Sequence, residues 1–356
     1  MSYGKEIINR SASEPVVSIV IPVHNGGEQF KRCLSAASDA ISPSDEIIVV
    51  ADGDTDGSWQ FAEKFGVKVL KIPEAGGPAK ARNLGAREAT GDLVFFIDAD
   101  VVIVSDTVER VTAVFRGNSG LAALFGSYDD EPSETNLLSQ YKNLLHHYVH
   151  QTSKEDAFSF WTGCGAIRRD IFMEMGGFNE TYRHPSIEDI ELGYRLRKAG
   201  HKIRLVKEIQ VKHLKRWDVI SLVKTDFFCR ALPWTSLILK ENLLTDDLNL
   251  KTSARISTIL VYLLLFTGIL TFFSPWLLIP IVCCIIMLLA LNRDMYLFFT
   301  KKRGLGFVIK TLPWHWLYFF YSGLAFAIGY GNYLIKRRGQ IMPQRHKDTK
   351  THKEPP

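Results

Sequence analysis

Apolar runs and polar loops alternate along the chain up to about residue 250. Short runs rich in β-branched and aromatic residues predict strands, and the amphipathic stretches between them predict helices. The strands are expected at residues 16–21, 46–50, 67–72, 93–97 and 203–206. The helices are expected at residues 28–40, 59–65, 79–89 and 186–199. This alternation predicts an α/β domain with a doubly wound, mostly parallel sheet and helices on both of its faces.

Two carboxylates stand directly after the most apolar of these runs. The run at residues 93–97 predicts a strand buried on both faces, and Asp98 and Asp100 follow at its C-terminal end. Ligands bind at that edge of open α/β sheets, and alternate residues of an extended chain point the same way. Carboxylate oxygens suit Mg²⁺ or Mn²⁺, with a substrate diphosphate completing the coordination. The alternative is a solvated turn that closes the strand.

Loops rich in Asn, Asp and Gly follow the first three predicted strands, at residues 22–27, 51–58 and 74–78. Each loop alone is equally typical of a turn or a helix cap. Because the carboxyl ends of parallel strands meet at one edge of a sheet, the loops together with Asp98 and Asp100 favour a nucleotide pocket.

The last third of the chain is dominated by apolar segments. Residues 256–273 and 276–291 carry no charge and are separated by Ser274-Pro275, which predicts a tight hairpin of two membrane spans. Residues 314–335 form a third apolar segment that opens with Trp and Tyr, and we expect a third span there. An interfacial helix is the alternative. The basic residues at 293–310 indicate the cytosolic side.

These patterns divide the chain into five parts. They are a flexible N-terminus (1–15), an α/β domain (16–220), an interfacial helical linker (221–250), a transmembrane region (251–335) and a basic tail (336–356).

Composition and charge narrow the partners. The net charge of the 356 residues is +5, and the tail's basic cluster follows an apolar run. It therefore favours anionic lipid headgroups over nucleic acid. The five cysteines show no paired spacing, so we expect them to be reduced. The polar N-terminus predicts no signal peptide. We expect a multi-pass protein of the cell (inner) membrane with its α/β domain in the cytoplasm.

One pair of histidines has the spacing of a metal site. His146 and His150 share one face of a predicted helix, but no carboxylate pattern accompanies them. We expect a solvated or acceptor-facing helix rather than zinc.

Residues 16 to about 217 resemble the family 2 glycosyltransferases of GT-A fold. The resemblance rests on Val-Ser-Ile-Val-Ile-Pro-Val-His-Asn (17–25), Asp-Gly-Asp-Thr-Asp-Gly-Ser (52–58), Gly-Pro-Ala-Lys-Ala-Arg-Asn (77–83) and Asp-Ala-Asp (98–100). It implies that the first loop and the acidic turn hold the nucleobase and ribose. The donor-binding residues it implies are Pro22, Asn25, Asp52, Arg82 and Asp98.

The sequence departs from the family at two positions near this pocket. His24 stands where an aromatic residue is common, and Ala51 stands where a second Asp is common. Both departures leave the identity of the nucleotide open.

Two downstream blocks extend the resemblance. The small-residue block at 161–169 implies an acceptor-side role for Gly163. The Glu188-Asp189 pair opens a predicted helix, and the resemblance implies that one carboxylate is the general base. We choose Asp189, with Glu188 as the neighbour that supports or replaces it. The helix dipole would keep Asp189 ionised. Acidic residues that merely stabilise a helix N-terminus are the alternative.

A third block, His213-Leu-Lys-Arg216-Trp217, resembles the family's Gln-x-x-Arg-Trp motif with His in place of Gln. The resemblance places Arg216 near the diphosphate and Trp217 near the acceptor, while the lost Gln disfavours a processive polymerase. Both residues are equally suited to anchor the segment that follows.

The sequence therefore predicts a membrane-anchored, inverting glycosyltransferase. Mg²⁺ or Mn²⁺ on Asp100 and Asp98 would assist transfer from a nucleotide-diphosphate sugar, most simply a UDP-sugar, to a lipid or lipid-linked glycan. A nucleotidyltransferase of related fold and a non-catalytic, nucleotide-sensing membrane subunit are the alternatives. The lack of charge in 256–291 argues against an ion path.

Overall fold

The computed structural model describes residues 15–241 and 251–348, and it describes side-chain burial up to residue 335. The predicted flexible N-terminus lies almost entirely outside the described residues. The described chain forms two compact units. Within the described residues, the first comprises residues 15–129, Lys154–His184 and Glu188–Lys215, and the second comprises Asp130–Ser153, Pro185–Ile187 and residues 216–241 and 251–348. Residues 130–153 fall within the predicted α/β domain (16–220), but in the structure they pack with the C-terminal helices.

The first unit is built on a mixed sheet with strand order β3-β2-β1-β4-β7-β6-β8-β5. Its strands are β1 (Val17–Val23), β2 (Glu46–Asp52), β3 (Lys68–Ile72), β4 (Leu93–Ile97), β5 (Val101–Val102), β6 (Leu121–Tyr128), β7 (Cys164–Arg168) and β8 (Lys202–His213). Strands β1 to β4 pair in parallel, as do β6 and β8. Strand β7 runs antiparallel between β4 and β6, and β5 is antiparallel to β8. The predicted mostly parallel sheet is confirmed.

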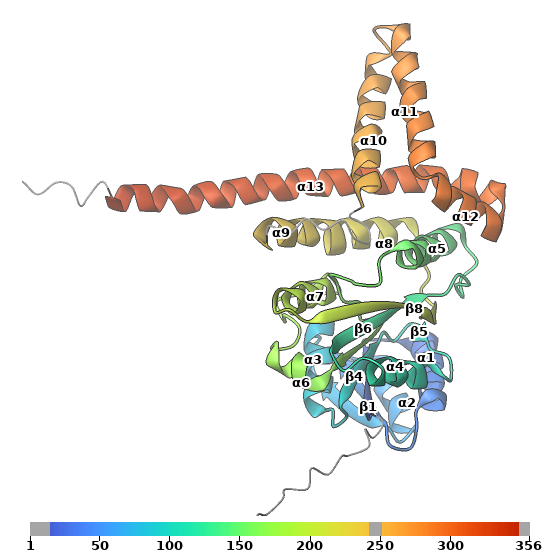
Figure 1. The fold of residues 1–356 in the computed structure, drawn as a ribbon, viewed down its shortest axis with the longest axis vertical. Coiled ribbons are helices and arrows are strands. Elements are labelled where there is room, and N and C mark those ends of the chain that lie inside the picture. Colours follow the sequence, from blue (N-terminus) through green and yellow to red (C-terminus); the bar gives the residue numbers. More distant parts are fainter. Residues whose placement is uncertain (1–14, 242–250, 349–356) are drawn as a thin grey trace, which may run out of the picture. The chain divides into compact units, whose positions relative to one another are not determined.

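Helices cover both faces of this sheet, as predicted, because alternate strand residues point to opposite faces. Ile19 and Ile21 of β1 share a core with α1 (Gly27–Ala40), α2 (Ser58–Glu63) and α4 (Thr107–Arg116). Val20, between them, belongs to a second core with α3 (Pro78–Glu88), α6 (Arg169–Glu174) and α7 (Glu188–Lys198). Figure 1 shows the strands fanned between these two helical layers. The central strand β1 is thus buried on both sides.

The second unit is entirely helical in the part that the structure describes. It contains α5 (Leu137–Thr152), α8 (Val219–Lys224), the π-helix η1 (Thr225–Ala231), α9 (Leu232–Glu241), α10 (Thr252–Leu270), η3 (Pro275–Leu277), α11 (Leu278–Leu291), α12 (Arg293–Arg303) and α13 (Leu305–Asp348). Pro233 lies in the first turn of α9, where a missing N–H is tolerated, and the wider π-helix precedes it.

Helix α5 differs from the solvated helix predicted for the histidine pair. It packs against α12 and α13, and His147 and His150 are buried. The rings of His146 and His150 lie with their centroids 4.0 Å apart and are tilted by 43° to one another. No group of three or more His, Cys, Asp or Glu side chains suited to a metal occurs among the described residues.

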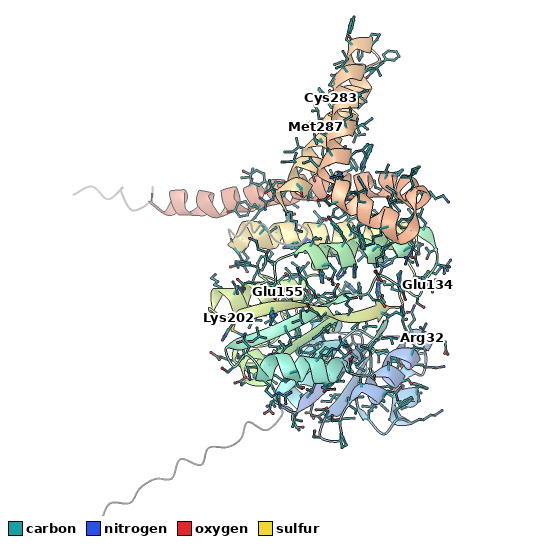
Figure 2. The ribbon with its side chains drawn as sticks, turned by 45° about the vertical axis from the view of Figure 1, so that its right-hand side comes forward. Arg32, Glu134, Glu155, Lys202, Cys283 and Met287 are labelled. Carbon is teal, nitrogen blue, oxygen red and sulfur yellow. The ribbon has the colours of Figure 1, made fainter. Side chains whose placement is uncertain are left out.

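Helices α10 and α11 form an apolar hairpin that projects away from α9 and α13 (Figure 1). Cys283 and Met287 lie on the outer surface of this hairpin (Figure 2), and Met287 is 48% exposed. At its tip Phe272 is 90% exposed and Trp276 is 80% exposed. Exposed apolar surface of this extent marks a membrane or protein contact.

The helices that could cross a membrane are fewer than predicted. In the described residues, α10 alone is long and apolar enough. The stretch Pro275–Leu291 passes only together with Arg293–Arg303, from which it is bent by 66°. The third span at 314–335 is not among the candidates. That stretch belongs to α13, which contains His315, Ser322 and Asn332, packs on α9, α10 and α12, and continues past the expected boundary at residue 335.

Candidate active site

The loops after β1 and β2 hold each other through backbone N–H groups and acidic side chains. Asn25 adopts a φ of 52°, which Asn tolerates, and its N–H donates to Asp54 Oδ1 at 3.1 Å. The N–H of Thr55 donates back to Asn25 Oδ1 at 2.8 Å, and the N–H of Gly27 donates to Asp56 Oδ2 at 2.9 Å. The predicted donor residue Asn25 therefore sits in a fixed loop pair at the carboxyl edge of the sheet, where Pro22 pairs with Val50.

Asp52 ties the loop after β3 to the same edge. It is 5% exposed, and its two carboxylate oxygens accept the N–H groups of Gly76 at 2.7 Å and Gly77 at 2.8 Å. Gly77 has a φ of 93°, and a Cβ there would lie 2.3 Å from the Arg183 carbonyl oxygen. A bulkier residue would break this contact. In the structure Asp52 anchors the loop, a role that the sequence did not predict.

Arg82 connects two other predicted site residues, Asp98 and Glu188. Its guanidinium is buried, with Nη2 2.6 Å from Asp98 Oδ1 and Nη1 2.8 Å from Glu188 Oε1. These side chains come from α3, from the end of β4 and from the start of α7. Burial lowers the pKa of Arg82, but the charges of Asp98 and Glu188 outweigh it and hold that pKa above its ordinary value. Asp98 and Glu188 are therefore committed to a permanent ion-pair network.

Asp100 has a different partner, His213. His213 Nε2 lies 3.6 Å from Asp100 Oδ2, and its ring stacks on Tyr128 with centroids 4.2 Å apart. The pairing of β5 with β8 sets Val101 opposite His213, which places the two side chains at one end of the sheet. Burial raises the pKa of Asp100, but His213 and Lys215 more than offset this and lower it. Asp98 and Asp100 thus have different protein partners, and their predicted common site stays a prediction.

Asp100 and His213 fit a divalent cation that takes only some of its ligands from the protein. Two ligand atoms that each lie about 2.1 Å from one ion are roughly 3 to 4 Å apart. The separation between Asp100 Oδ2 and His213 Nε2 falls within this range. Carboxylate oxygen and imidazole nitrogen both suit Mn²⁺. Because the described residues contain no closed group of three such ligands, an ion here would need further ligands from a diphosphate.

Asp189 lies apart from these ion pairs, at the start of α7. Its Oδ2 accepts the Thr162 N–H at 3.2 Å, and its Oδ1 accepts the Ile190 N–H at 2.8 Å. Burial and the charge of Glu188 raise the pKa of Asp189 to about 6, against the lowering effect of Arg82. The N–H groups of Thr162 and Ile190, the second in the first turn of α7, lower the pKa in the direction expected of a helix N-terminus. Asp189 is mostly ionised at neutral pH.

Gly163 supports this region by packing. It is buried, and a Cβ there would lie 2.3 Å from the Trp161 ring. It lies next to Thr162, which contacts Asp189. Gly163 thus lets the turn before β7 lie close against the Trp161 ring.

Arg216 and Trp217 belong to the second unit. Arg216 Nη1 lies 3.2 Å from Glu134 Oε2. Trp217 is buried in a small cluster with Leu138 and Leu222. These contacts are those of residues that anchor the second unit, and the predicted roles at the diphosphate and acceptor stay predictions.

His213 is the site residue whose partner the sequence did not reveal. The Gln-to-His replacement in the last block was the available signal, since imidazole is a metal ligand and an amide side chain rarely is. Asp100 and His213 are too far apart in sequence for any local pattern to pair them.

The fold is of GT-A type. The structure is similar to that of a mannosyltransferase from Pyrobaculum calidifontis, solved in complex with GDP-Man and Mn²⁺, with a TM-score of 0.55 and 14% sequence identity. The similarity covers 89% of this chain and 88% of that one.

Residues 18–176 match the family described as glycosyl transferase family 2. The chain is 29% identical to the probable glycosyltransferase YdaM of Bacillus subtilis (strain 168) over 206 residues, which is 53% of this chain and 48% of YdaM. It is 27% identical to a validoxylamine A glucosyltransferase of Streptomyces hygroscopicus subsp. limoneus over 265 residues, which is 62% of this chain and 57% of that protein. The chain spans about half the length of these relatives.

Proposed function

We propose that this protein is a metal-dependent, inverting glycosyltransferase that moves a sugar from a nucleotide-diphosphate sugar to a hydroxyl of a lipid or lipid-linked glycan. The observation that carries the proposal is that the site's four carboxylates have different partners. Arg82 pairs with Asp98 and Glu188, Asp100 faces His213, and Asp189 accepts the backbone N–H groups of Thr162 and Ile190. One carboxylate thus remains for proton transfer.

Asp189 is the residue we assign as general base. Inverting transfer to an alcohol needs a group that takes the alcohol's proton as the new bond forms. A pKa of about 6 leaves Asp189 ionised at neutral pH and makes it a stronger base than an ordinary Asp. Glu188 is 3% exposed and paired with Arg82, so it is poorly placed to meet an acceptor.

Asp100 and His213 would hold the Mg²⁺ or Mn²⁺, and Asp98 would orient Arg82 beside it. When bound, the cation neutralises the negative charge that develops on the leaving diphosphate. The Pyrobaculum mannosyltransferase that is similar in fold was solved with Mn²⁺, which supports this choice. Arg82 contributes a fixed positive charge at the same edge.

The donor would lie against the three loops tied together by Asp52. Pro22, Asn25 and Asp52 form this wall by their own contacts, whichever base stacks there. A UDP-sugar is the donor we test first, and GDP-mannose is the second because the Pyrobaculum mannosyltransferase was solved with it. His24 and Ala51, the two departures from the family, lie at the same wall.

The second unit would attach the enzyme to a membrane and select a lipid-based acceptor. The α10–α11 hairpin exposes large apolar side chains, and Lys301, Lys302 and Arg303 end α12. Cations beside an apolar hairpin favour its cytosolic side. A multi-pass location in the cell membrane, with the catalytic unit in the cytoplasm, is part of this proposal.

A donor-binding experiment tests the assignment. Purified protein is heated with UDP-sugars, GDP-mannose or free nucleotides, each with Mn²⁺ or with a chelator. One nucleotide sugar should raise the melting temperature with Mn²⁺ and lose most of this effect with the chelator, since ligand binding to the native state stabilises it. Equal stabilisation by a nucleoside triphosphate would point to a nucleotidyltransferase instead.

A further inference from the structure

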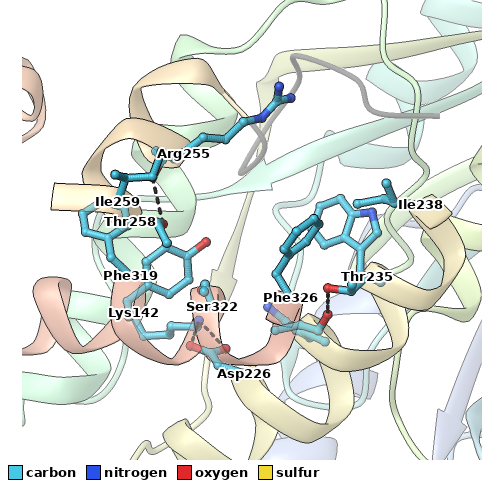
Figure 3. Close-up of a pocket in the computed structure, with 16 residues that line it drawn as sticks. Lys142, Asp226, Thr235, Ile238, Arg255, Thr258, Ile259, Phe319, Ser322 and Phe326 are labelled. Atoms are coloured by element: carbon cyan, nitrogen blue, oxygen red, sulfur yellow. Dashed lines mark hydrogen bonds and ion pairs between the residues drawn. The ribbon is translucent and has the colours of Figure 1, made fainter. Parts of the chain in front are cut away.

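The second unit contains a cavity of about 360 Å³. Side chains of α5, η1, α9, α10 and α13 line it, and Figure 3 shows them converging. A volume of this size falls within the usual range for small-ligand sites. None of the residues assigned to sugar transfer contributes to it.

Two glycines of α13 fix the helices around the cavity. A Cβ at Gly323 would lie 2.5 Å from the Tyr262 ring of α10, and a Cβ at Gly329 would lie 2.6 Å from Thr235 Cγ2 of α9. Helix α13 therefore touches α10 at one point and α9 at another, and Phe326, which lines the cavity, lies between these points in sequence. Small residues permit such close approach of helices. The cavity is thus enclosed by tightly packed helices.

The charged groups at one end of the cavity have partners within the protein. Lys142 Nζ lies 2.6 Å from both carboxylate oxygens of Asp226, and the Tyr321 hydroxyl donates to Asp226 Oδ2 at 2.6 Å. Burial raises the pKa of Asp226, but the charges of Lys142 and Arg230 outweigh burial and hold that pKa below its ordinary value. Figure 3 shows Arg255 turned away from this end of the cavity. These groups need no counter-charge from a ligand.

The hydroxyl groups of the lining are also used within the protein. Those of Thr235 and Thr258 donate to carbonyl oxygens four residues earlier in their own helices, at 2.8 Å and 3.0 Å. The hydroxyls of Tyr318 and Ser322 are hydrogen-bonded to each other. A ligand that offers hydrogen-bonding groups would therefore gain little here, because its polar groups would lose water without gaining new partners.

The rest of the lining is apolar. Trp234 and Ile238 come from α9, Ile259 from α10, and Phe319 and Phe326 from α13. Phe319 is only 2% exposed, whereas Ile259 is 66% exposed, so the cavity leads from a buried apolar interior to the outer surface. An apolar cavity excludes water well and binds apolar molecules, since the side chains around it otherwise lack contacts on one side. The lining therefore suits hydrocarbon.

The open side of the cavity continues as an apolar stripe along α10. Ile259, Leu263 and Phe266 are exposed and are spaced by four and three residues, which places them on one face of the helix. In the described residues, α10 is the helix that is long and apolar enough to cross a membrane on its own. A lipid chain packed along this stripe would meet the open side of the cavity.

We infer that the cavity takes up one hydrocarbon chain of a membrane lipid, which enters past Ile259 and Phe326 and reaches the buried Phe319. The chemistry it selects is that of an acyl or isoprenoid chain, and the headgroup stays outside. The inference rests on the membrane attachment included in the proposed function. It does not rest on sugar transfer, because every contact lies within the second unit.

Photolabelling of the full chain in phosphatidylcholine vesicles tests this inference. The probe is a trace of phosphatidylcholine with a diazirine at the end of one acyl chain, and mass spectrometry locates the label after illumination. Exposed Ile269 of α10 should be labelled by the surrounding lipid and serves as the internal standard. Phe319 and Ile238 are buried, so label on them requires a chain inside the cavity.

Variants that fill the cavity provide the second measurement. Ala231→Phe and Ala254→Phe add bulk to the lining without changing its charge. Each should lower the label on Phe319, relative to Ile269, at least about tenfold. The matched control Ala290→Phe makes the same change at an exposed residue of α11 outside the cavity and should alter the ratio less than about twofold. Retained label on Ile269 shows that each variant is folded and inserted.

Three outcomes would overturn the inference. The first is label on Ile269 without label on Phe319, as expected if a second copy of the chain covered the open side. The second is a Phe319 label that neither filling variant reduces. The third is absence of label from both residues, which would refute the membrane attachment as well.

Probes of different structure identify the chain. A straight acyl probe and an isoprenoid probe are compared at equal mole fraction, and the one that labels Phe319 more strongly is the preferred source. Phosphatidylglycerol and phosphatidylcholine probes with the same chain should label Phe319 within about threefold of each other, because the headgroup stays outside. A preference of about tenfold or more for the anionic lipid would contradict a site that binds only the chain.

Discussion

Asp189 and Glu188 are neighbours in sequence, yet the fold gives them opposite surroundings. Glu188 faces the Arg82 guanidinium, whereas Asp189 faces backbone N–H groups. We predict that Asp189→Asn lowers turnover by about two to four powers of ten, the usual effect of losing a general base. Donor affinity should barely change, because the base contacts the acceptor.

Steady-state kinetics and donor binding on the same preparation check this prediction. Glu188→Gln is the informative control, since it breaks the Arg82 network and should reduce donor binding together with turnover. If Asp189→Asn lost donor binding in parallel with turnover, Asp189 would be a structural or donor-binding residue.

The raised pKa of Asp189 gives the reaction a pH dependence of known sign. The base works only when ionised, so protonation below its pKa of about 6 removes activity. We predict that kcat/KM is level near neutrality and falls about tenfold per pH unit below 6. The residual activity of Asp189→Asn should show no such fall, and a wild-type profile that stays flat down to pH 5 would exclude Asp189 as the base.

The contact between Asp100 and His213 predicts a shared role in cation binding. We predict that His213→Gln keeps the fold but raises the Mn²⁺ concentration for half-maximal activity at least about tenfold, as loss of a metal-site group does. Asp100→Asn should abolish metal-dependent turnover. Metal titrations of both variants, with circular dichroism as a folding control, measure this. Unchanged turnover of Asp100→Asn at saturating Mn²⁺ would remove Asp100 from the cation site.

At the scale of elements, the apolar hairpin makes the strongest prediction. Phe272 and Trp276 are among its most exposed side chains, and charges at this tip would have to enter the bilayer for the hairpin to insert. We predict that Phe272→Asp with Trp276→Asp shifts the protein from the membrane fraction toward the soluble fraction. Charged residues within a bilayer each cost up to about 3 kcal/mol.

Val104→Asp is the matched control for the hairpin variant. It places a charge on a half-exposed apolar residue of the first unit, and partition should not change. Wild-type partition of the double hairpin variant would mean that α9, α12 or α13 is the main anchor.

The elements that the sequence predicted well are those whose burial depends on local pattern. Strands β1, β2 and β4 are apolar runs that need no knowledge of their partners, and their predicted ends are within about two residues of the observed ones. Strand β7 was missed because Cys164–Arg168 is short and contains small residues. Its place depends on antiparallel pairing with β4 and β6, which is far from local.

The candidate site also divides into residues found from local motifs and contacts that depend on the fold. The carboxylates at the end of β4 and at the start of α7 were recognised from local motifs. The bond from Arg82 to Glu188 joins residues 106 positions apart, and the Asp100–His213 contact depends on the pairing of β5 with β8. Long-range contacts of this kind follow from topology, which single motifs do not contain.

At the scale of the whole molecule, the chain joins a catalytic unit to a helical unit. Residues 130–153 and 185–187 belong to the helical unit although the catalytic sheet flanks them in sequence. The chain therefore passes between the units several times, and a cut near residue 220 would divide the helical unit. Variants of single residues in the full chain are for this reason more informative than truncations.

Transfer itself is the most direct test of the central claim. Purified full-length protein is incubated with a radiolabelled nucleotide sugar, Mn²⁺ and membrane lipid extract, and both the released nucleotide and the lipid-extractable label are measured. We expect nucleoside diphosphate and labelled lipid in equal amounts, both lost with a chelator and both reduced by about two to four powers of ten in Asp189→Asn. Release of pyrophosphate, or nucleotide binding without labelled product under every donor and acceptor, would contradict the account.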